Sequence, residues 1–176
     1  MIVVGTGSAM NIVYPSIEMN HRIKIAVIDK DEPGGICLTR GCIPSKLLLY
    51  PAELVREIER AEMFGIDLEL KKVDFEKVME RMRTLISTDI GMIKKSLSSD
   101  PNIDYYQEVA EFISPYTMKA GAETISSKMI FLCTGSKPLI PPIKGLKDAG
   151  FHTSDTLLGM TELPESIAII GFSCRG

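Results

Sequence analysis

The chain has 176 residues, enough for one domain with a sizeable core or for one domain and the start of another. Apolar residues make up 45% and charged residues 24%, close to the globular average, which argues against disordered and fibrous classes. The 20 basic and 23 acidic residues give a net charge of −3, and no Lys/Arg cluster indicates a nucleic-acid partner. We expect no membrane partner and a cytoplasmic location, because no apolar run reaches roughly 18 residues and no signal peptide opens the chain.

The first 30 residues predict a strand, a helix and a second strand. The apolar residues 1–4 are followed by Gly5 and Gly7, a pattern typical of a buried strand that leads into a tight turn. A helix is expected over 8–20 and a short apolar strand over 24–30. Such a unit is parallel and right-handed.

The middle of the chain predicts two helices followed by short strands. Apolar spacing indicates helices over 45–64 and 74–97, and the second contains a Met-rich stripe that is typical of core packing. Alternating pieces over 102–128 predict an antiparallel meander, and 128–138 predicts a buried strand entering another glycine turn. A proline-rich connector follows, and 166–171 predicts a further strand.

The segment GTGSAM, which starts at Gly5, lies between a predicted strand and a predicted helix, the context that a dinucleotide-binding fingerprint requires. Gly5 would allow the turn, Gly7 would admit a pyrophosphate close to the backbone, and the helix N-terminus would supply N–H donors. Met10 stands where the third glycine is usual. Asp29, at the end of the next strand, is placed to accept hydrogen bonds from a ribose. A generic α/β turn with a solvated aspartate remains the alternative.

Four of the residues are cysteines, and two of them, Cys37 and Cys42, flank four residues within GGICLTRGCIPSK. A zinc site would need a second ligand pair, which the chain does not offer beyond His21 and His152, so no metal site is expected. A purely structural disulfide across so short a loop would stabilise the fold by about 2 kcal/mol at most. Reactive thiols fit better, since a helix that begins near Ser45 would place Cys42 at its N-terminus, where the helix dipole favours thiolate.

The cysteine segment resembles the redox-disulfide signature of the flavin-dependent pyridine nucleotide-disulfide oxidoreductases, in particular dihydrolipoamide dehydrogenases and mercuric reductases. The resemblance continues through GTGSAM, Asp29, the two-helix region, the meander, CTGSKP and LPESIAIIG. It implies a Rossmann-like α/β FAD-binding domain, a parallel sheet with helices plus an antiparallel meander, over 1–152. Residues 153–176 would be a linker and the first strand of a truncated NAD(P)-binding domain.

The resemblance also implies roles for individual residues. Cys42 would exchange electrons with the flavin and form the charge-transfer thiolate, Cys37 would attack the substrate disulfide, and Lys46 would lie beside flavin N5. The other expected FAD contacts are Gly5, Gly7, Ser8, Ala9, Asp29, Lys30, Gly34, Gly35, Ile36, Ala110, Thr134, Gly135 and Ser136. The cofactor would be FAD with NAD(P)H as co-substrate. The partners would be a lipoamide-like disulfide or dithiol, or a metal ion, and the complete enzyme would be a homodimer.

Several positions depart from the family pattern. Ile36 replaces a threonine, Cys133 replaces an alanine, and Ser173 and Cys174 replace a central glycine and a tyrosine of the second fingerprint. The resemblance therefore predicts an N-terminal fragment, with the second nucleotide domain and the family's catalytic histidine absent. Three alternatives remain open: a mercuric reductase-like metal-ion reductase, a non-catalytic FAD-binding module, and a single-Rossmann NAD or SAM protein with inert cysteines.

Overall fold

The computed structural model describes residues 1–171, so the departures predicted at Ser173 and Cys174 lie outside the described residues. The chain divides into two compact units. The first comprises Met1–Thr39 with Ser87–Lys137, and the second comprises Arg40–Ile86 with the chain from Pro138. In the described part of the chain, no helix has both the length and the apolar character needed to cross a membrane.

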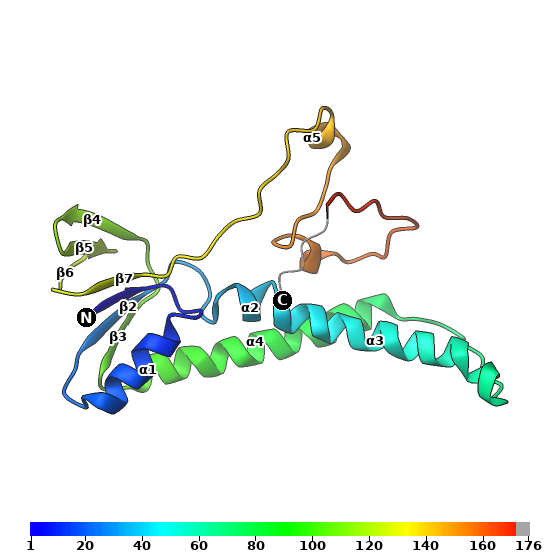
Figure 1. The fold of residues 1–176 in the computed structure, drawn as a ribbon, viewed down its shortest axis with the longest axis horizontal. Coiled ribbons are helices and arrows are strands. Elements are labelled where there is room, and N and C mark those ends of the chain that lie inside the picture. The colour runs from blue at the N-terminus through cyan, green and yellow to red at the C-terminus, as the bar shows by residue number, and fades with distance from the viewer. Residues whose placement is uncertain (172–176) are drawn as a thin grey trace. The chain divides into compact units, whose positions relative to one another are not determined.

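The first unit is built on a parallel sheet, seen edge-on beside the N-terminus in Figure 1. Its strand order is β3-β2-β1-β7, and every neighbouring pair is parallel. The strands are β1 (Ile2–Val4), β2 (Ile25–Ile28), β3 (Ile103–Tyr106) and β7 (Ile130–Leu132). The predicted strand–helix–strand unit at the start of the chain is confirmed, with α1 (Met10–Met19) as its helix.

The two faces of this sheet bury different partners, because successive strand side chains point to opposite faces. Val3 and Val27 face a cluster that includes Val13 of α1 and Leu97 of α4 (Phe75–Ser99). The residues that alternate with them, Ile2, Ala26 and Ile28, pack against Met118 and Ala120. The sheet is therefore covered by helices on one face and by an antiparallel layer on the other.

The antiparallel layer is a meander of β4 (Ala110–Ser114), β5 (Thr117–Ala120) and β6 (Glu123–Ser126). It confirms the predicted meander in type but not in extent. Residues 103–106 belong instead to the parallel sheet, where Ile103 pairs with Ile25. The alternation of side chains is the same for both kinds of strand, so the sequence pattern could not tell which neighbour this strand would take.

The strand β7 is shorter and more exposed than the buried strand predicted over 128–138. It occupies an edge of the sheet among the described residues, and its last residue, Leu132, is 60% exposed. Residues 133–145 after it carry no helix or strand, as the proline-rich connector predicts.

The second unit is mainly helical. It holds α3 (Cys42–Arg60), the 3₁₀ turn η1 (Ala61–Phe64), residues 75–86 of α4, the short α5 (Leu146–Ala149) and η2 (Leu157–Gly159). Gly65 ends η1 in the left-handed conformation at φ 75°, which confirms the predicted stop. The helix predicted from Ser45 begins three residues earlier, at Cys42, because Pro44 is tolerated in the first turn, where backbone N–H groups have no helical acceptor.

The strand predicted over 166–171 is wrong, since these residues form no strand. An apolar run becomes a strand only when a neighbour pairs with its backbone, and no other part of residues 1–171 does so. The side chains of Ile167, Ile169 and Ile170 are more than half exposed.

Candidate functional site

The turn after β1 requires glycine at position 5. Gly5 has φ 111°, and a Cβ on it would lie 2.2 Å from the carbonyl oxygen of Cys133. The backbone is fixed here from both sides, because Gly5 donates to Ile28 O at 2.8 Å and Cys133 donates to Val4 O at 2.8 Å. The turn is therefore held in one conformation, at the carboxyl ends of the parallel strands β1, β2 and β7.

A second glycine turn meets the first. Gly34 and Gly35 have φ values of 111° and 64°, conformations that favour glycine. A Cβ on Gly35 would lie 2.5 Å from the Cα of Gly7, and a Cβ on Gly7 would lie 3.2 Å from the Cα of Gly35. The two turns thus contact each other backbone to backbone, with no room for side chains between them.

A buried threonine holds the two turns together. Thr6 is 2% exposed and donates to Asp29 Oδ2 from its backbone nitrogen at 2.9 Å and from its hydroxyl at 2.6 Å. The same hydroxyl accepts a hydrogen bond from the backbone of Gly34 at 3.1 Å. Thr6 was missed in the sequence analysis, although its place between the two fingerprint glycines was a signal that could have found it.

Backbone donors gather at the start of α1. The first turns of this helix close on themselves, with Met10 donating to Gly7 O and Asn11 donating to Ser8 O. Within residues 1–171, the hydrogen bonds found leave the N–H groups of Gly7, Ser8 and Ala9 without a protein acceptor. Unsatisfied N–H groups at a helix N-terminus form a site suited to an anion such as a phosphate.

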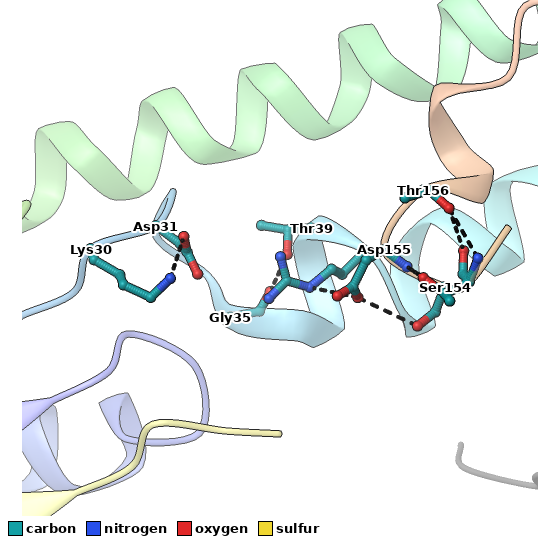
Figure 2. A network of polar contacts seen from close by, with 9 residues as sticks. Lys30, Asp31, Gly35, Thr39, Ser154, Asp155 and Thr156 are labelled. Carbon is teal, nitrogen blue, oxygen red and sulfur yellow. Dashed lines mark hydrogen bonds and ion pairs between the residues drawn. The ribbon is translucent and has the colours of Figure 1, made fainter. Parts of the chain in front are cut away.

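Asp29 retains capacity for one more hydrogen bond. A carboxylate offers about four lone-pair sites. Three are occupied, two by Thr6 and one by the backbone of Asp31, which donates to Asp29 Oδ1 at 3.1 Å. Lys30 next to it forms an exposed ion pair with Asp31 at 3.3 Å, shown in Figure 2. Asp29 is thus mainly a structural anchor with one acceptor position left.

The loop after β2 is tied to α4 by a charged pair. Lys94 Nζ lies 2.7 Å from Glu32 Oε2 and donates to Oε1 at 3.0 Å, while Gln107 donates to Oε1 at 3.4 Å. The hydrogen bond from Lys94 holds the pKa of the Glu32 carboxyl below its ordinary value. This pair fixes the loop that leads to Gly34 and Gly35.

Tyr105 of β3 lies close to the same carboxylates. Burial raises the pKa of its phenol to about 12, with further contributions from the negative charges of Asp29 and Glu32. Its hydroxyl oxygen is buried and has no hydrogen-bond partner among the described residues. The phenol therefore stays protonated, at the cost of an unsatisfied polar group.

The third glycine turn follows β7. Thr134, Gly135 and Ser136 are exposed, and Gly135 has φ 71°. The side chain of Ile36 lies 3.6 Å from where a Cβ on Gly135 would be, so this turn adjoins the cysteine segment. Ala110 lies on β4, where it pairs with Ala120 and packs against the buried residues on one face of the sheet.

The two motif cysteines sit on consecutive helices. Cys37 is exposed on α2 (Gly35–Thr39), a short helix absent from the sequence prediction, and Cys42 is the first residue of α3 and half-buried. The boundary between the two units falls between them, at Thr39 and Arg40, so their pairing stays a prediction. Lys46, also in the second unit, is exposed on the first turns of α3.

An ion pair lies next to Cys42 in the chain. Arg40 Nε is 3.2 Å from Asp155 Oδ1, and both side chains are about one-third exposed. Asp155 belongs to a hydrogen-bonded turn with Ser154 and Thr156, labelled in Figure 2. Neither residue was singled out in the sequence analysis, and only the position of Arg40 between the cysteines could have drawn attention to it.

Comparison with known proteins identifies the family in which this combination of glycine turns and cysteines occurs. The family model described as pyridine nucleotide-disulphide oxidoreductase matches residues 1–174. The chain belongs to this family. It is an α/β member, with the parallel sheet, covering helices and antiparallel layer described above.

Curated members of the pyridine nucleotide-disulphide oxidoreductases resemble the chain over most of its length. A mycothione reductase of Mycobacterium tuberculosis is 31% identical over 175 residues, 96% of this chain and 38% of that protein. A dihydrolipoyl dehydrogenase of Bacillus subtilis is 33% identical over 162 residues, 85% of this chain and 34% of that protein. A mercuric reductase of Lysinibacillus sphaericus is 27% identical over 172 residues, 97% of this chain and 31% of that protein.

A solved structure shows the same fold. The HOCl-induced flavoprotein disulfide reductase RclA from Escherichia coli superposes with a TM-score of 0.75 and 26% identity, covering 93% of this chain and 34% of that one. The chain thus spans about a third of the length of the proteins that it matches. The family assignment therefore covers this part, and the activity of a whole enzyme is a matter of proposal.

Proposed function

We propose that this chain forms the FAD-binding and redox-cysteine part of a flavin-dependent disulfide oxidoreductase. The single observation that carries the proposal is the contact between Gly7 and Gly35, where two backbones meet at a distance that excludes any Cβ. Such bare backbone beside a helix N-terminus suits a pyrophosphate, the central group of FAD. The fit is favourable, because the neighbouring N–H groups have no protein acceptor among the described residues.

The residues that would hold FAD follow from this arrangement. The N–H groups of Gly7, Ser8 and Ala9 would bind the pyrophosphate, and the remaining acceptor position of Asp29 would take a ribose hydroxyl. Further backbone contacts are proposed, with support from the family resemblance, for Gly5, Lys30, Gly34, Gly35, Ile36, Ala110, Thr134, Gly135 and Ser136. Lys46 would lie beside the flavin ring. Bound FAD supplies two-electron chemistry and accepts hydride from NAD(P)H.

The cysteines would carry the two electrons onward. A Cys37–Cys42 disulfide that takes up two electrons and two protons becomes two thiols. The Cys37 thiolate then attacks a substrate disulfide, forming a mixed disulfide and releasing the first substrate thiol. The Cys42 thiolate attacks the Cys37 sulfur, which releases the second substrate thiol and restores the protein disulfide. With a dithiol substrate of the lipoamide type the same steps run in reverse.

Two further parts of the proposal rest on the relatives alone. The substrate class is a small disulfide or dithiol, as the names of the mycothione reductase and dihydrolipoyl dehydrogenase relatives suggest. A metal ion is the second candidate, favoured by the likeness to mercuric reductase over 97% of the chain. The cytoplasmic location and the homodimeric complete enzyme that were expected in the sequence analysis stay predictions.

A flavin titration tests the proposal. The purified chain is mixed with FAD, and free FAD is followed by its fluorescence after equilibrium dialysis. Retention of FAD by the wild-type chain and its loss in Gly35→Ala are expected. A folded wild-type chain that does not bind FAD would overturn the proposal. A chain that binds FAD but shows no NAD(P)H-driven appearance of two thiols per molecule is the non-catalytic module, whereas turnover with lipoamide or with mercuric ion would identify the acceptor.

A further inference from the structure

We infer that the open edge of β7 is a docking surface for a second copy of this chain, which pairs its own β7 antiparallel to the first. The inference concerns the assembly of the chain and goes beyond the proposed redox function. β7 ends the sheet order β3-β2-β1-β7, and within residues 1–171 no strand pairs with its other side. A strand in that position offers backbone donors and acceptors to another chain.

The backbone groups on this edge belong to Ile130 and Leu132. The Met129 carbonyl accepts a hydrogen bond from β1 at 2.9 Å, and the Cys133 N–H donates to β1 at 2.8 Å. Backbone groups alternate between the two sides of a strand, so those of Ile130 and Leu132 point away from β1. In the antiparallel pair, Ile130 of one copy and Leu132 of the other exchange both N–H···O bonds.

The sequence around β7 suits pairing with itself. Residues 129–133, MIFLC, are apolar and contain no charge and no proline, the residues that usually protect an exposed edge. The strand at the opposite end of the sheet order, β3, carries the exposed Asp104. In a pair centred on Phe131, every residue of 129–133 meets an apolar residue. The two copies of Lys128 then lie about 20 Å apart along the strands, beyond the roughly 8 Å screening length of physiological salt.

A hollow beside β7 has room for side chains of the second copy. Its volume is about 550 Å³, and its lining includes Met129, Ile130 and Phe131 on one side and Phe112 and Tyr116 of the β4–β5 hairpin on the other. An exposed apolar hollow of this kind is typical of a protein interaction site.

Leu132 is the side chain that fills this hollow in the pair. It lies opposite Val4 in the parallel sheet, and Val4 packs on the face that the meander covers. Leu132 therefore lies on the same face, and it is 60% exposed. The pairing brings Leu132 of one copy beside Ile130 of the other, where Phe112, 55% exposed, can cover it.

The two-fold symmetry of the pair repeats this contact. Each copy inserts its Leu132 into the hollow of the other, so the interface is self-complementary and closes at two copies. Each copy contributes a sheet of four strands, and the joined sheet of about eight strands stays within the usual range. The edge of β7 is then covered in both copies.

Sedimentation velocity of the purified chain over about 1–100 µM tests the inference, since interfaces of modest size dissociate in this range. We expect the wild type to shift from monomer to dimer as its concentration rises. Leu132→Lys places a charge inside the interface in both copies and should raise the dissociation constant at least about tenfold. Leu139→Lys is the matched control and should dimerise like the wild type, because Leu139 lies outside β7 and is 93% exposed.

Disulfide trapping tests the register. Phe131→Cys places one thiol of each copy at the two-fold axis, where the Cα atoms of a non-hydrogen-bonded pair lie about 4.5 Å apart, within disulfide range. Added diamide accepts two electrons and two protons from the two thiols, which join as one disulfide. Mass spectrometry should find a peptide linked at position 131 in both copies. Leu139→Cys is the control and should crosslink more slowly.

The outcomes separate this pairing from other uses of the edge. Dimerisation that Leu132→Lys weakens and Leu139→Lys does not, with a crosslink at position 131, supports the inference. A wild-type chain that stays monomeric throughout, equal effects of the two lysine substitutions, association beyond the dimer, or a dimer without that crosslink would overturn it. A monomeric chain leaves the edge for a strand of a different polypeptide.

None of these measurements uses FAD. A chain that dimerises in this way but does not bind FAD would refute the proposed function and leave the inference standing. A chain that binds FAD and stays monomeric would refute the inference alone.

Discussion

Thr6 donates two hydrogen bonds to one carboxylate oxygen of Asp29, at 2.9 Å from its backbone and 2.6 Å from its hydroxyl. The same hydroxyl accepts from the backbone of Gly34, so one side chain joins the ends of β1 and β2 to the turn before α2. Hydrogen bonds to a charged group are worth about 1.5–3 kcal/mol each, and more is lost when a buried partner is left unsatisfied. The glycine turns thus depend on this threonine for their relative position.

Thr6→Val tests that dependence. Valine has a similar shape but lacks the hydroxyl, so Asp29 loses a donor and Gly34 loses an acceptor. We expect the free energy of unfolding to fall by about 1–3 kcal/mol in urea titrations. Thr6→Ser keeps the hydroxyl and should retain most of the stability. Equal stability of the valine and serine variants would contradict this role of the hydroxyl.

The contact between the glycine turns makes Gly35 intolerant of any side chain. In Gly35→Ala the new Cβ would lie 2.5 Å from the Cα of Gly7, at a backbone φ of 64°. Such strain costs about 1–3 kcal/mol, and separation of the turns should weaken FAD binding at least tenfold. Urea titration and FAD fluorescence measure the two effects.

Gly91 provides the matched control. It lies within α4, and a Cβ there would meet nothing within 4 Å. Gly91→Ala is expected to raise stability by up to about 1 kcal/mol, because alanine is the better helix former, and to leave FAD binding unchanged. A loss of FAD binding in Gly91→Ala equal to that in Gly35→Ala would contradict the explanation by close contact between the two glycine turns.

Tyr105 should make the fold sensitive to alkali. Its phenol has a pKa of about 12 in the folded chain, above the ordinary value of 10, so the unfolded chain gives up the proton first as pH rises. The contribution is full below pH 10 and is lost between about pH 10 and 12. Tyr105→Phe removes this loss and also removes a buried hydroxyl without a partner, so the variant should match or exceed wild-type stability at pH 7.

Urea midpoints at pH 7, 10 and 11 check the prediction for Tyr105. Tyr14→Phe, at a partly exposed position on α1, is the control and should follow the wild-type curve at each pH. A Tyr105→Phe variant that loses stability above pH 10 as steeply as the wild type would show that this phenol is not the cause.

The Glu32–Lys94 pair should stabilise the fold at neutral pH and not in acid. The pKa of Glu32 is lowered in the folded chain, so its contribution is present above the unfolded value and is lost as pH falls through the lower folded value. Both side chains are more than a third exposed, which limits the effect of Lys94→Met to roughly 0.5 kcal/mol. Urea midpoints of the variant and wild type should differ at pH 7 and converge in acid, once the Glu32 carboxyl is protonated in the folded chain too; a constant difference would point to lost packing instead.

The sequence predicted the parts of the fold that local chemistry determines. The strand and turn at Gly5, the long helix of α4 and the stop at Gly65 follow from apolar spacing and from the conformational freedom of glycine. Two features could not be predicted, the parallel pairing of the strand at 103–106 and the absence of a strand at 166–171, because a strand is defined by its partner. Both segments were expected to be strands, yet only the first pairs with a neighbour among the described residues.

In the candidate site, too, local features could be predicted and tertiary contacts could not. The glycines and cysteines stand out in the sequence because few other residues allow their backbone conformations or chemistry. Thr6, Lys94 and Asp155 do not, since each acts through a contact with a residue far away in the chain: Asp29, Glu32 and Arg40. Whether a polar side chain stabilises a loop depends on which residues lie near it in the folded chain. Periodicity and motif spacing carry no information about these tertiary neighbours.

The pairing of β1 also bears on when the fold can form during synthesis. Ile2 lies between Ala26 on one side and Ile130 on the other, so the strand made first receives its second neighbour roughly 130 residues later. At about 5–20 residues per second, the ribosome needs roughly 6–26 s to deliver it. Until then β1, an apolar strand whose Ile2 and Val3 are fully buried in the finished sheet, lacks at least one of its two neighbours. The nascent chain therefore exposes this unpaired apolar edge until β7 emerges, and unpaired strand edges of this kind are prone to aggregation.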